Sequence, residues 1–489
     1  MASENQQLHF ILVPLMSSSH IIPLTDFAKL LARQGQDVTI ITTPLNAIRL
    51  NPIIQRAIKS NLKVQLIPLR FPCQEAGLPE GCENLDELTS PDLTKHFFVA
   101  SGMLQEPLEK VLAKLVPRPT CIVSTNAIPW THEIAQKFGI PMYVFHTISC
   151  FTLVCSHSIN HSKILETVNS DYESVLLPDM PHKIEFKNSQ LPDMMRKNSS
   201  ESKNMLDKVK EAENSAQGVV VNSFEELEPS YVEKCKNMMK NVWCIGPVSQ
   251  CNKEMLDKFE RGNKASIDEN DCLKWLDSVK PKSVIYACFG SVSHISPTQS
   301  IEIGLGLEAS NRPFIWIISD RDYSIEVKKW LEDDTFEERI KGRGLIIRGW
   351  APQVLILSHS SIGGFLTHCG WNSTLEAVCA GVPMITWPMF AEQFYNEKFV
   401  VHVLRIGVRI GVEGVLESGE DAHDRVLVKG EQVKKAIDQL MDEGEEGEER
   451  RKRAREVGDM AKGTTEAGGS SYSNTKLLIQ DVIKWRMHQ

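Results

Sequence analysis

The chain has 489 residues, a formal net charge of -9 and a hydrophobic fraction of 42%. This length exceeds what one core usually holds and favours two domains of roughly 200 residues each. The acidic balance argues against a nucleic-acid partner. No apolar run approaches the roughly 20 residues that cross a bilayer, and Met1 to Gln7 does not read as a signal peptide, so we expect a cytoplasmic protein without membrane insertion.

Apolar strand-like runs alternate with amphipathic segments through the first half of the chain. The runs are residues 10–13, 38–41, 64–67, 121–123, 142–145 and 219–221. Such continuous apolar runs, separated by helical patterns, are typical of a parallel sheet that is covered by helices on both faces. We therefore predict a doubly wound α/β domain over residues 1–247.

The second half repeats this pattern after a polar, charged segment. Residues 248–271 lack apolar periodicity and are predicted to be a linker. Strand-like runs follow at residues 283–287, 314–318, 345–347, 362–365 and 384–386, which predicts a second doubly wound domain over residues 272–465. Ligands of open α/β sheets bind beyond the carboxyl ends of the strands, so we expect both substrates in a cleft between the two domains.

The segment from Trp350 to Gln393 has the pattern of an anion site. The apolar run Ser361 to Leu366 reads as a buried strand, and it stops at the polar turn Thr367 to Ser373. Thr374 to Gly381 then reads as a helix that ends in glycine. The start of a helix presents backbone N–H groups and a positive dipole end to an anion. A diphosphate is the anion that this turn favours.

The side chains around the turn suit a nucleotide diphospho-sugar better than a bare phosphate. Trp350 offers a flat face for a base, and Gln353 and Glu376 can bind ribose hydroxyls. Glu392 and Gln393 bring acceptor and donor groups that suit sugar hydroxyls. The hydrogen-bond donors beside the predicted anion are His368, Asn372 and Ser373. So many polar groups at the start of a helix require a ligand or one another as partners.

The whole segment from Trp350 to Gln393 resembles the donor-binding signature of plant family 1 UDP-dependent glycosyltransferases, the secondary product glycosyltransferases. His20, the turn Phe289-Gly290-Ser291 and the segment Asn222 to Leu227 also stand where that family has them. The end of the signature, Phe390 to Phe394, is similar to the flavonoid and triterpenoid glucosyltransferase branch. The resemblance implies a GT-B fold: two facing Rossmann-like domains with a cleft between them, and a final helix in residues 466–489 that packs back on the first domain.

The resemblance also implies a set of donor-binding residues. They are Ser291, Trp350, Ala351, Gln353, His368, Trp371, Asn372, Ser373, Glu376, Glu392 and Gln393, with Thr147 as a further contact to the sugar. It associates Gln393 with glucose and Trp371 with a neutral sugar.

We expect no cofactor besides UDP-glucose as co-substrate, and we expect a monomer. We also expect no metal, because Asp320-Arg321-Asp322, which resembles the metal motif of a different glycosyltransferase architecture, lies in a charged loop.

His20 is the candidate general base. It follows the first predicted strand after Ser17 to Ser19 and precedes Pro23 and a helix, which places it at the carboxyl end of that strand. Imidazole titrates near neutral pH and can take the proton of an acceptor hydroxyl as that hydroxyl attacks the sugar. The position in the family's pattern supports the same role.

The residue that usually assists this histidine is absent. The family has an aspartate at the end of a Cys-Ile-Val-Ser-Asp pattern, whereas this chain has Thr125 after Cys121 to Ser124. A hydroxyl can fix a tautomer, but it cannot stabilise imidazolium by charge. Three interpretations remain open: His20 acts alone on an acidic acceptor; Thr125, Asn126 or a carboxylate from elsewhere orients it; or the enzyme is slow or inactive.

The resemblance implies inverting transfer of glucose from UDP-glucose to a hydroxyl or carboxyl of a hydrophobic plant metabolite, a triterpenoid or a flavonoid or other phenolic, giving a β-glucoside. The acceptor is expected against variable apolar segments at residues 71–85, 97–103 and 184–195. Two alternatives remain open. One is a catalytically weakened protein that binds UDP-sugar or aglycone, and the other is a different nucleotide-sugar enzyme of the same architecture, such as an epimerase or phosphorylase.

Overall fold

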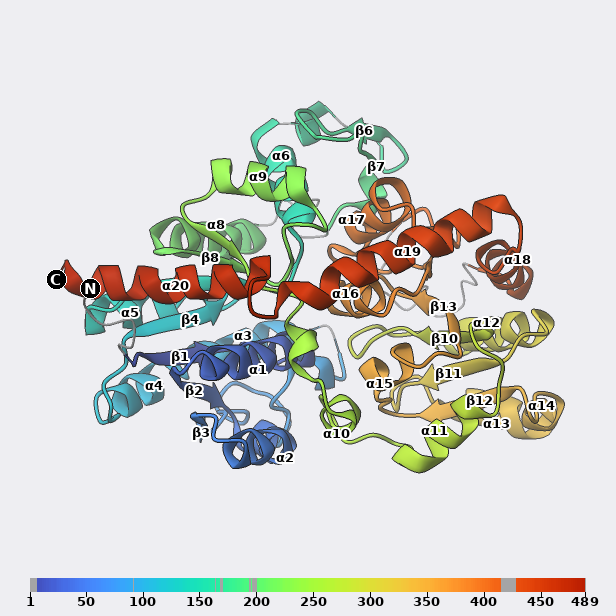
Figure 1. Cartoon of the computed structure of the whole chain (residues 1–489), viewed down its shortest axis with the longest axis horizontal. Coiled ribbons are helices and arrows are strands. Elements are labelled where there is room, and N and C mark those ends of the chain that lie inside the picture. Colours follow the sequence, from blue (N-terminus) through green and yellow to red (C-terminus); the bar gives the residue numbers. More distant parts are fainter. Residues whose placement is uncertain are drawn as a thin grey trace. The chain divides into compact units, whose positions relative to one another are not determined.

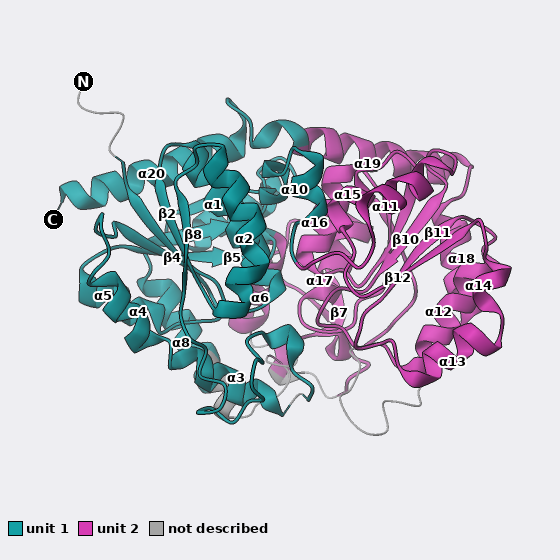
Figure 2. Ribbon diagram, turned by 90° about the horizontal axis from the view of Figure 1, so that it is seen from below, with its two compact units in different colours: residues 1–150, 198–262, 462–489 teal, residues 151–197, 263–461 magenta. Residues whose placement is uncertain are grey.

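The computed structural model describes residues 7–90, 92–162, 164–167, 170–192, 195, 200–414 and 428–488. It forms two compact units, drawn in different colours in Figure 2. Unit 1 comprises residues 1–150, 198–262 and 462–489, and unit 2 comprises residues 151–197 and 263–461. Each unit has its own parallel sheet, which confirms the prediction of two doubly wound domains. The chain passes between the units more than once, because residues 151–197 belong with unit 2.

The sheet of unit 1 has the order β3-β2-β1-β4-β5-β8-β9, and all its pairings are parallel. Its strands are β1 (His9–Val13), β2 (Asp37–Thr42), β3 (Val64–Pro68), β4 (Cys121–Thr125), β5 (Met142–His146), β8 (Gly218–Val221) and β9 (Val242–Cys244). Every residue of β1, β4, β5 and β8 is buried, which explains their continuous apolar sequences. The chain order reverses between β1 and β4, so the carboxyl ends of these two strands form a topological switch point, where open sheets bind ligands.

Helices cover both faces of this sheet. They are α1 (Ser18–Arg33), α2 (Pro44–Lys59), η1 (Leu85–Glu87), α3 (Leu93–Gly102), α4 (Gln105–Leu112), α5 (Thr131–Phe138), α8 (Ser200–Ser215), α9 (Pro229–Met238), η4 (Val248–Cys251), α10 (Met255–Phe259) and α20 (Ser470–Met487). Figure 1 shows α20, coloured red, alongside the strands of this unit. Leu478 and Val482 of α20 are fully buried in the unit 1 core, so the last helix is part of this unit.

The segment predicted as a linker is folded against α1. Residues 248–271 contain η4 and α10, and they end inside α11. Its Arg261 forms an ion pair of 2.7 Å with the buried Asp26 of α1, and Asp257 lies 3.1 Å from the buried Lys29. The charges that make this segment look solvated are therefore partners of charges on α1. A buried charge requires such a partner, because its desolvation is otherwise costly.

The sheet of unit 2 has the order β12-β11-β10-β13-β14-β15 and is also parallel. Its strands are β10 (Val284–Cys288), β11 (Phe314–Ile318), β12 (Gly344–Arg348), β13 (Ile362–Thr367), β14 (Met384–Thr386) and β15 (Gly407–Arg409). All five strands predicted for this half are present. The edge strand β15 was missed, because Val408 is its only large apolar side chain. The order reverses between β10 and β13, so the turns after these strands are neighbours.

The remaining elements surround this sheet or extend from it. They are α6 (Cys150–Ser162), η2 (Ile164–Thr167), the antiparallel pair β6 (Ser174–Leu176) and β7 (Glu185–Lys187), η3 (Asn188–Gln190), α11 (Glu269–Asp277), α12 (Pro297–Ala309), α13 (Ile325–Asp333), α14 (Phe336–Arg339), α15 (Gln353–Leu357), α16 (Trp371–Ala380), α17 (Gln393–Lys398), the π-helical turn η5 (Phe399–Val403), α18 (Gly430–Leu440) and α19 (Glu445–Thr464). The core of the unit lies between β10, β11 and β13 and the helices α12, α13 and α18.

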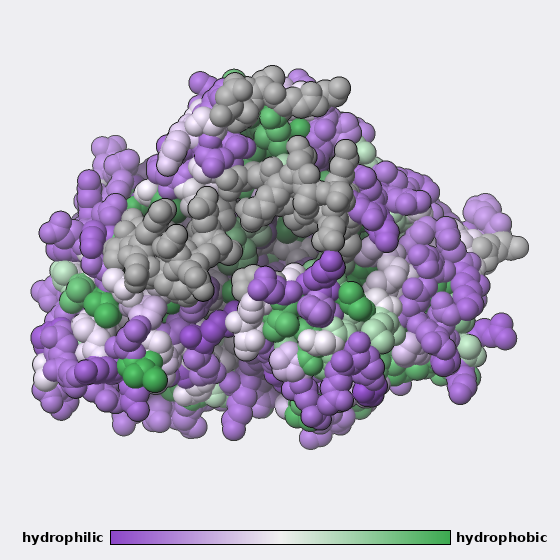
Figure 3. Space-filling model, turned by 180° about the vertical axis from the view of Figure 1, so that it is seen from behind, coloured by the Kyte–Doolittle hydropathy of each residue, from purple (hydrophilic) through white to green (hydrophobic). Residues whose placement is uncertain are grey.

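The surface is mainly polar. Figure 3 shows a face covered largely by hydrophilic residues, with apolar residues between them. In the part of the chain that the structure describes, no helix has both the length and the apolar character that crossing a membrane requires. All twelve cysteines are free thiols, and only Cys288 is more than slightly accessible.

Candidate functional site

The predicted anion-binding turn is present in unit 2. β13 ends at Thr367, and α16 begins at Trp371 after Gly370, whose extended backbone forms the N-cap. The helix then runs for ten residues and ends at Gly381, which has a φ of +67°. The backbone N–H groups of its first turn therefore lie directly beyond the carboxyl end of a central strand. This is the geometry in which helices bind phosphate groups.

Two glycines make room for the ring of His368. A Cβ atom on Gly290, in the turn after β10, would lie 2.6 Å from Nε2 of His368, and a Cβ on Gly370 would lie 2.4 Å from the same atom. No side chain larger than hydrogen fits at either position without moving the ring. The sequence therefore brings the turns after β10 and β13 together around one imidazole.

The imidazole of His368 has a ring nitrogen without a partner in the described part of the chain. Its Nδ1 is buried and has no hydrogen-bond partner among the described residues. Desolvation lowers the pKa of His368 to about 4, so the imidazole is neutral near pH 7 and carries one N–H. Buried polar atoms are nearly always paired in proteins, so this nitrogen indicates a missing partner. An oxygen of a diphosphate on the helix terminus would supply it.

The predicted ribose ligands are already assembled. Nε2 of Gln353, on α15, donates to Oγ of Ser373 at 3.0 Å and to Oε2 of Glu376 at 2.8 Å. Glu376 is buried, and this contact orients its carboxylate. A fixed carboxylate can accept hydrogen bonds from two neighbouring hydroxyls, as the ribose of a nucleotide presents them. The three side chains form one unit although they come from two helices.

Trp350, the predicted base-stacking residue, is held by its backbone. Its N–H donates to Oγ of Ser266 at 3.0 Å, and its carbonyl accepts from the N–H of Ser266 at 2.8 Å. Its indole Nε1 is buried and lacks a hydrogen-bond partner among the described residues. Ala351, the next predicted donor residue, is buried. The backbone of Trp350 is thus fixed, and base stacking on its ring stays a prediction.

Replacing Trp350 by alanine should weaken the binding of UDP by about 1–3 kcal/mol, because a base loses its stacking surface. Isothermal titration calorimetry with UDP measures this change directly. Trp330→Ala is a matched control in the same unit, since Trp330 is also half-buried but lies tilted against Phe336, with ring centroids 4.6 Å apart. Equal UDP affinity in the wild type and a folded Trp350→Ala variant would place the base elsewhere.

The side chain of Gln393, at the end of the signature, is held by hydrogen bonds to the backbone. Oε1 of Gln393 accepts from the backbone N–H groups of Met389 at 2.8 Å and Phe390 at 3.1 Å. The amide oxygen is therefore engaged, and the amide nitrogen is the group directed to other partners. Burial raises the pKa of the neighbouring Glu392. Gln393 is thus expected to act on a sugar as a donor, with Glu392 as the acceptor.

The loop after β10 contains a residue that the sequence analysis missed. Ser291 was predicted, but Ser293 has the buried hydroxyl that lacks a hydrogen-bond partner in the described part of the chain. The alternation Ser-Val-Ser in this loop could have indicated it. Asp322 fixes the loop by accepting from the N–H of Ile295 at 2.9 Å and lying 3.0 Å from Nδ1 of His294. The second acid of Asp320-Arg321-Asp322 is therefore a loop anchor.

The predicted acceptor-side residues gather at the switch point of unit 1. His20 lies in the first turn of α1, directly beyond β1, and Thr125 is the last residue of the neighbouring β4. Nδ1 of His20 lies 3.0 Å from Oγ of Ser19. The pKa of His20 is lowered to about 4, chiefly by desolvation; the carboxylate of Asp86 opposes this shift, and His146 contributes to it. The imidazole is therefore neutral near pH 7.

Thr125 supports the loop before His20 rather than the imidazole. Its hydroxyl accepts a hydrogen bond of 2.8 Å from the backbone N–H of Leu15. It is completely buried and makes no hydrogen bond with His20 among the described contacts. Thr125 thus fastens the β1–α1 connection to the end of β4. Thr125 can therefore orient His20 only indirectly, through the backbone of the β1–α1 connection.

A second histidine ends the next strand. His146 is the last residue of β5, and its Nε2 lies 3.2 Å from Oε1 of Glu213 on α8. Its other ring nitrogen is buried without a hydrogen-bond partner in the described part of the chain. The contact with His146 outweighs burial and lowers the pKa of Glu213. Thr147, the predicted sugar contact, follows His146 at this same edge of the sheet and is half-buried.

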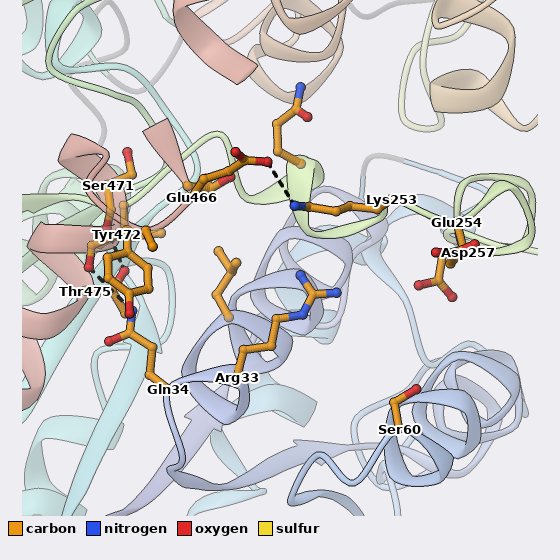
Figure 4. Close-up of a pocket in the computed structure, with 15 residues that line it drawn as sticks. Arg33, Gln34, Ser60, Lys253, Glu254, Asp257, Glu466, Ser471, Tyr472 and Thr475 are labelled. Carbon is orange, nitrogen blue, oxygen red and sulfur yellow. Dashed lines mark hydrogen bonds and ion pairs between the residues drawn. The ribbon is translucent and has the colours of Figure 1, made fainter. Parts of the chain in front are cut away.

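A cavity of about 600 Å³ in unit 1 lies apart from these residues (Figure 4). It is lined by parts of α1, the segment after η4 and the start of α20. Several of its charged side chains already have partners: Lys253 pairs with Glu466 at 3.0 Å, and Arg33 donates to the carbonyl of Cys251 at 2.8 Å. None of the predicted site residues lines it, so the cavity does not define the functional site.

Comparisons with known proteins agree with this geometry. A family model described as "UDP-glucoronosyl and UDP-glucosyl transferase" matches residues 122–440. The chain is 52% identical to UDP-glycosyltransferase 73E1 of Stevia rebaudiana, covering 99% of this chain and 98% of that protein. It is 49% identical to UDP-glycosyltransferase 73C3 of Arabidopsis thaliana, covering 98% and 96%.

A solved structure extends the likeness to three dimensions. The structure of Glycyrrhiza uralensis UGT73P12 complexed with glycyrrhetinic acid 3-O-monoglucuronide has a TM-score of 0.91 and 37% sequence identity to this chain. The match covers 99% of this chain and 97% of that one. Together with the two parallel-sheet units, it confirms the predicted fold class, GT-B.

Proposed function

Since the chain belongs to the plant family 1 UDP-glycosyltransferases, and is therefore a glycosyltransferase, we propose that it transfers glucose from UDP-glucose to a hydrophobic small molecule with inversion. The bond would form at a hydroxyl or carboxyl of the acceptor and give a β-glucoside. The observation that carries this proposal is the unpartnered Nδ1 of His368 at the start of α16, between two obligatory glycines. It supports a ligand with an anionic oxygen at that point.

The donor side of the reaction requires stabilisation of a leaving diphosphate. Negative charge develops on the diphosphate oxygen as its bond to the anomeric carbon breaks. The N–H groups of the first turn of α16 and the single N–H of neutral His368 are fixed before the reaction, so they stabilise this charge without reorganisation. Gln353, Ser373 and Glu376 would hold the nucleoside by its ribose.

The acceptor side requires removal of a proton. His20 is neutral near pH 7 and can accept the proton of a hydroxyl as the oxygen attacks the anomeric carbon. Attack from the face opposite the diphosphate inverts the configuration at that carbon. With a pKa of about 4, His20 is a weak base, so acidic acceptors such as phenols and carboxylic acids are expected to react fastest.

The acceptor class is proposed from apolar surroundings and from a relative. UGT73P12 was crystallised with glycyrrhetinic acid 3-O-monoglucuronide, which supports a triterpenoid acceptor here as well. Of the three predicted acceptor segments, residues 97–103 place Val99 and Met103 at the surface and Phe97 in the core. Residues 193 and 194 of the third segment lie outside the described residues. Phenolic acceptors remain part of the proposal.

The donor preference gives a test of Gln393. Wild-type enzyme should use UDP-glucose faster than UDP-galactose or UDP-glucuronate, and Gln393→His should shift the preference toward UDP-galactose. The amide oxygen of Gln393 accepts from the backbone N–H groups of both Met389 and Phe390, which an imidazole cannot do. The N–H of a histidine at this position would therefore lie elsewhere than the amide N–H of Gln393, and it would meet a different hydroxyl of the sugar. Initial rates with the three donors at one acceptor concentration measure the preference.

Gln299→His is the matched control for this experiment. Gln299 is also a buried glutamine whose amide bonds to backbone, at the N–H and carbonyl of Val428, but it lies outside the predicted donor set. Its replacement should leave the order of the three donors unchanged. A wild-type enzyme that uses UDP-galactose or UDP-glucuronate faster than UDP-glucose would contradict the assignment of glucose.

A further inference from the structure

The titratable groups around His20 come from η1, from the end of β5 and from α8. Asp86 lies in η1, and His146 ends β5 with its partner Glu213 on α8. Among the described groups that shift the pKa of His20, Asp86 is the one whose charge favours the protonated form. The aspartate that the family places at position 125 is replaced by a threonine bound to Leu15, so any carboxylate that assists the base comes from another part of the chain.

Asp86 contacts the helix that bears His20. Its Oδ1 accepts from the backbone N–H of Ser18 at 3.1 Å, and its Oδ2 accepts from the hydroxyl of Ser18 at 2.5 Å. The N-cap residue Ser17 makes no side-chain capping bond, so this carboxylate from a distant loop caps α1 in its place. A negative charge at the start of a helix is also favoured by the helix dipole.

Hydroxyl groups of the same turn lie beside the imidazole. Oγ of Ser19 lies 3.1 Å from Oγ of Ser17 and 3.0 Å from Nδ1 of His20. If Nδ1 carries the proton and donates it to Ser19, then Nε2 is the nitrogen that can accept a proton from a substrate. The first turn of α1, held by Asp86, therefore sets the place of the base, and Ser19 is the contact that would set its tautomer.

The turn that carries Asp86 is itself held in place. The N–H of Leu85 donates to the carbonyl of Met16 at 2.9 Å, and the buried Asn84 accepts from Nδ2 of Asn46 at 3.0 Å. These contacts join η1 to the β1–α1 connection and to α2. The carboxylate of Asp86 is thus presented to α1 by a rigid segment, as an orienting group requires.

We propose that Asp86 is the positioning residue that replaces the carboxylate absent at position 125, by anchoring the first turn of α1 and placing a negative charge beside His20. This inference rests on the proposed function. In the reaction, the acceptor O–H proton moves to Nε2 of His20, the acceptor oxygen bonds to the anomeric carbon, and UDP leaves with the electrons of the broken C–O bond. The charge of Asp86 stabilises the imidazolium that forms.

Asp86→Asn should lower kcat for a weakly acidic alcohol by about 10–100-fold, the usual cost of losing an orienting partner. The amide keeps the shape and an acceptor for Ser18, but it removes the charge. His20 then becomes a weaker base with a lower pKa, so the acidic limb of the kcat profile should move to lower pH. KM for UDP-glucose should stay constant, because the donor residues lie in unit 2.

Three further variants sharpen the test, with benzyl alcohol and 4-nitrophenol as acceptor probes. Asp86→Glu keeps the negative charge, so its kcat with the alcohol should be higher than that of Asp86→Asn. Thr125→Asp in the Asp86→Asn background should raise kcat as well, and more for the alcohol than for the acidic phenol. Glu87→Gln is the matched control, because Glu87 lies in the same turn but pairs with Arg49, so its removal should leave kcat and the acidic limb unchanged.

The outcomes separate two failures. A wild-type enzyme that forms no glucoside with any probe would overturn the proposed function. An active wild type with an Asp86→Asn variant that matches Glu87→Gln in kcat and in pH profile would overturn the role of Asp86 alone. If Asp86→Asn does not fold, Ser18→Ala, which removes the hydroxyl contact to Asp86, decides the question: a lower kcat supports the role, and an unchanged kcat refutes it.

Discussion

The His20→Ala variant should lose transfer to alcohols and phenols by about 10²–10⁴-fold, the usual contribution of a general base. Alanine removes the only imidazole in the first turn of α1, while Asp86 and Ser18 still cap the helix. UDP affinity should be nearly unchanged, because the predicted donor residues belong to unit 2. Rates with saturating UDP-glucose, together with calorimetry of UDP binding, measure both quantities.

The control for this variant is His9→Ala. His9 is a buried histidine at the amino end of β1, with ring nitrogens 2.7 Å from the carbonyl of Pro117 and 2.7 Å from Oγ1 of Thr39. Its loss should lower the melting temperature but leave kcat of the folded enzyme close to the wild-type value. His20→Ala turnover at the wild-type rate on a weakly acidic alcohol would remove His20 from the mechanism.

Gly290→Ala should weaken UDP binding by about 10–100-fold, which corresponds to losing one hydrogen bond to a charged group. Gly290 has a φ of +79°, and an added Cβ would lie 2.6 Å from Nε2 of His368. Backbone at the end of a sheet strand yields less than a side chain, so we expect the imidazole to move away from the diphosphate. Calorimetry with UDP gives the affinity, and thermal unfolding gives the cost in stability.

Gly342→Ala separates the displacement of His368 from backbone strain. Gly342 is in the same unit and has a φ of +83°, but nothing lies within 4 Å of its added Cβ. Both variants carry the left-handed strain of roughly 1–2 kcal/mol. Only Gly290→Ala should also lose UDP affinity. If the two variants bound UDP equally well, His368 would not be the diphosphate ligand.

The features that could be predicted are those encoded by neighbouring residues. The strands β10 to β14 are continuous apolar runs, because helices cover both faces of the sheet. The strand, turn and helix of the proposed donor site were also predictable, since His368, Asn372 and Ser373 follow one strand and open one helix within a single segment. Local patterns of this kind require no knowledge of the tertiary structure.

The features that were missed depend on contacts between distant segments. The capping of α1 by Asp86 joins residues separated by β2, α2 and β3, so no local pattern indicates it. The charges of residues 248–271 appeared to be solvated because their partners Asp26 and Lys29 lie on α1. The two glycines around His368 were recognisable as turns, but their close approach to one ring appears only when the turns after β10 and β13 are brought together.

Product analysis tests the central claim most directly. Wild-type enzyme would be incubated with UDP-glucose and a panel of triterpenoids and phenolics, and the products would be analysed by mass spectrometry and NMR. We expect an acceptor that gains one hexose in the β configuration, with one UDP released for each glucoside formed. Hydrolysis or epimerisation of UDP-glucose without a glycosylated acceptor, or binding of UDP-glucose without any turnover across the panel, would contradict the proposed transfer.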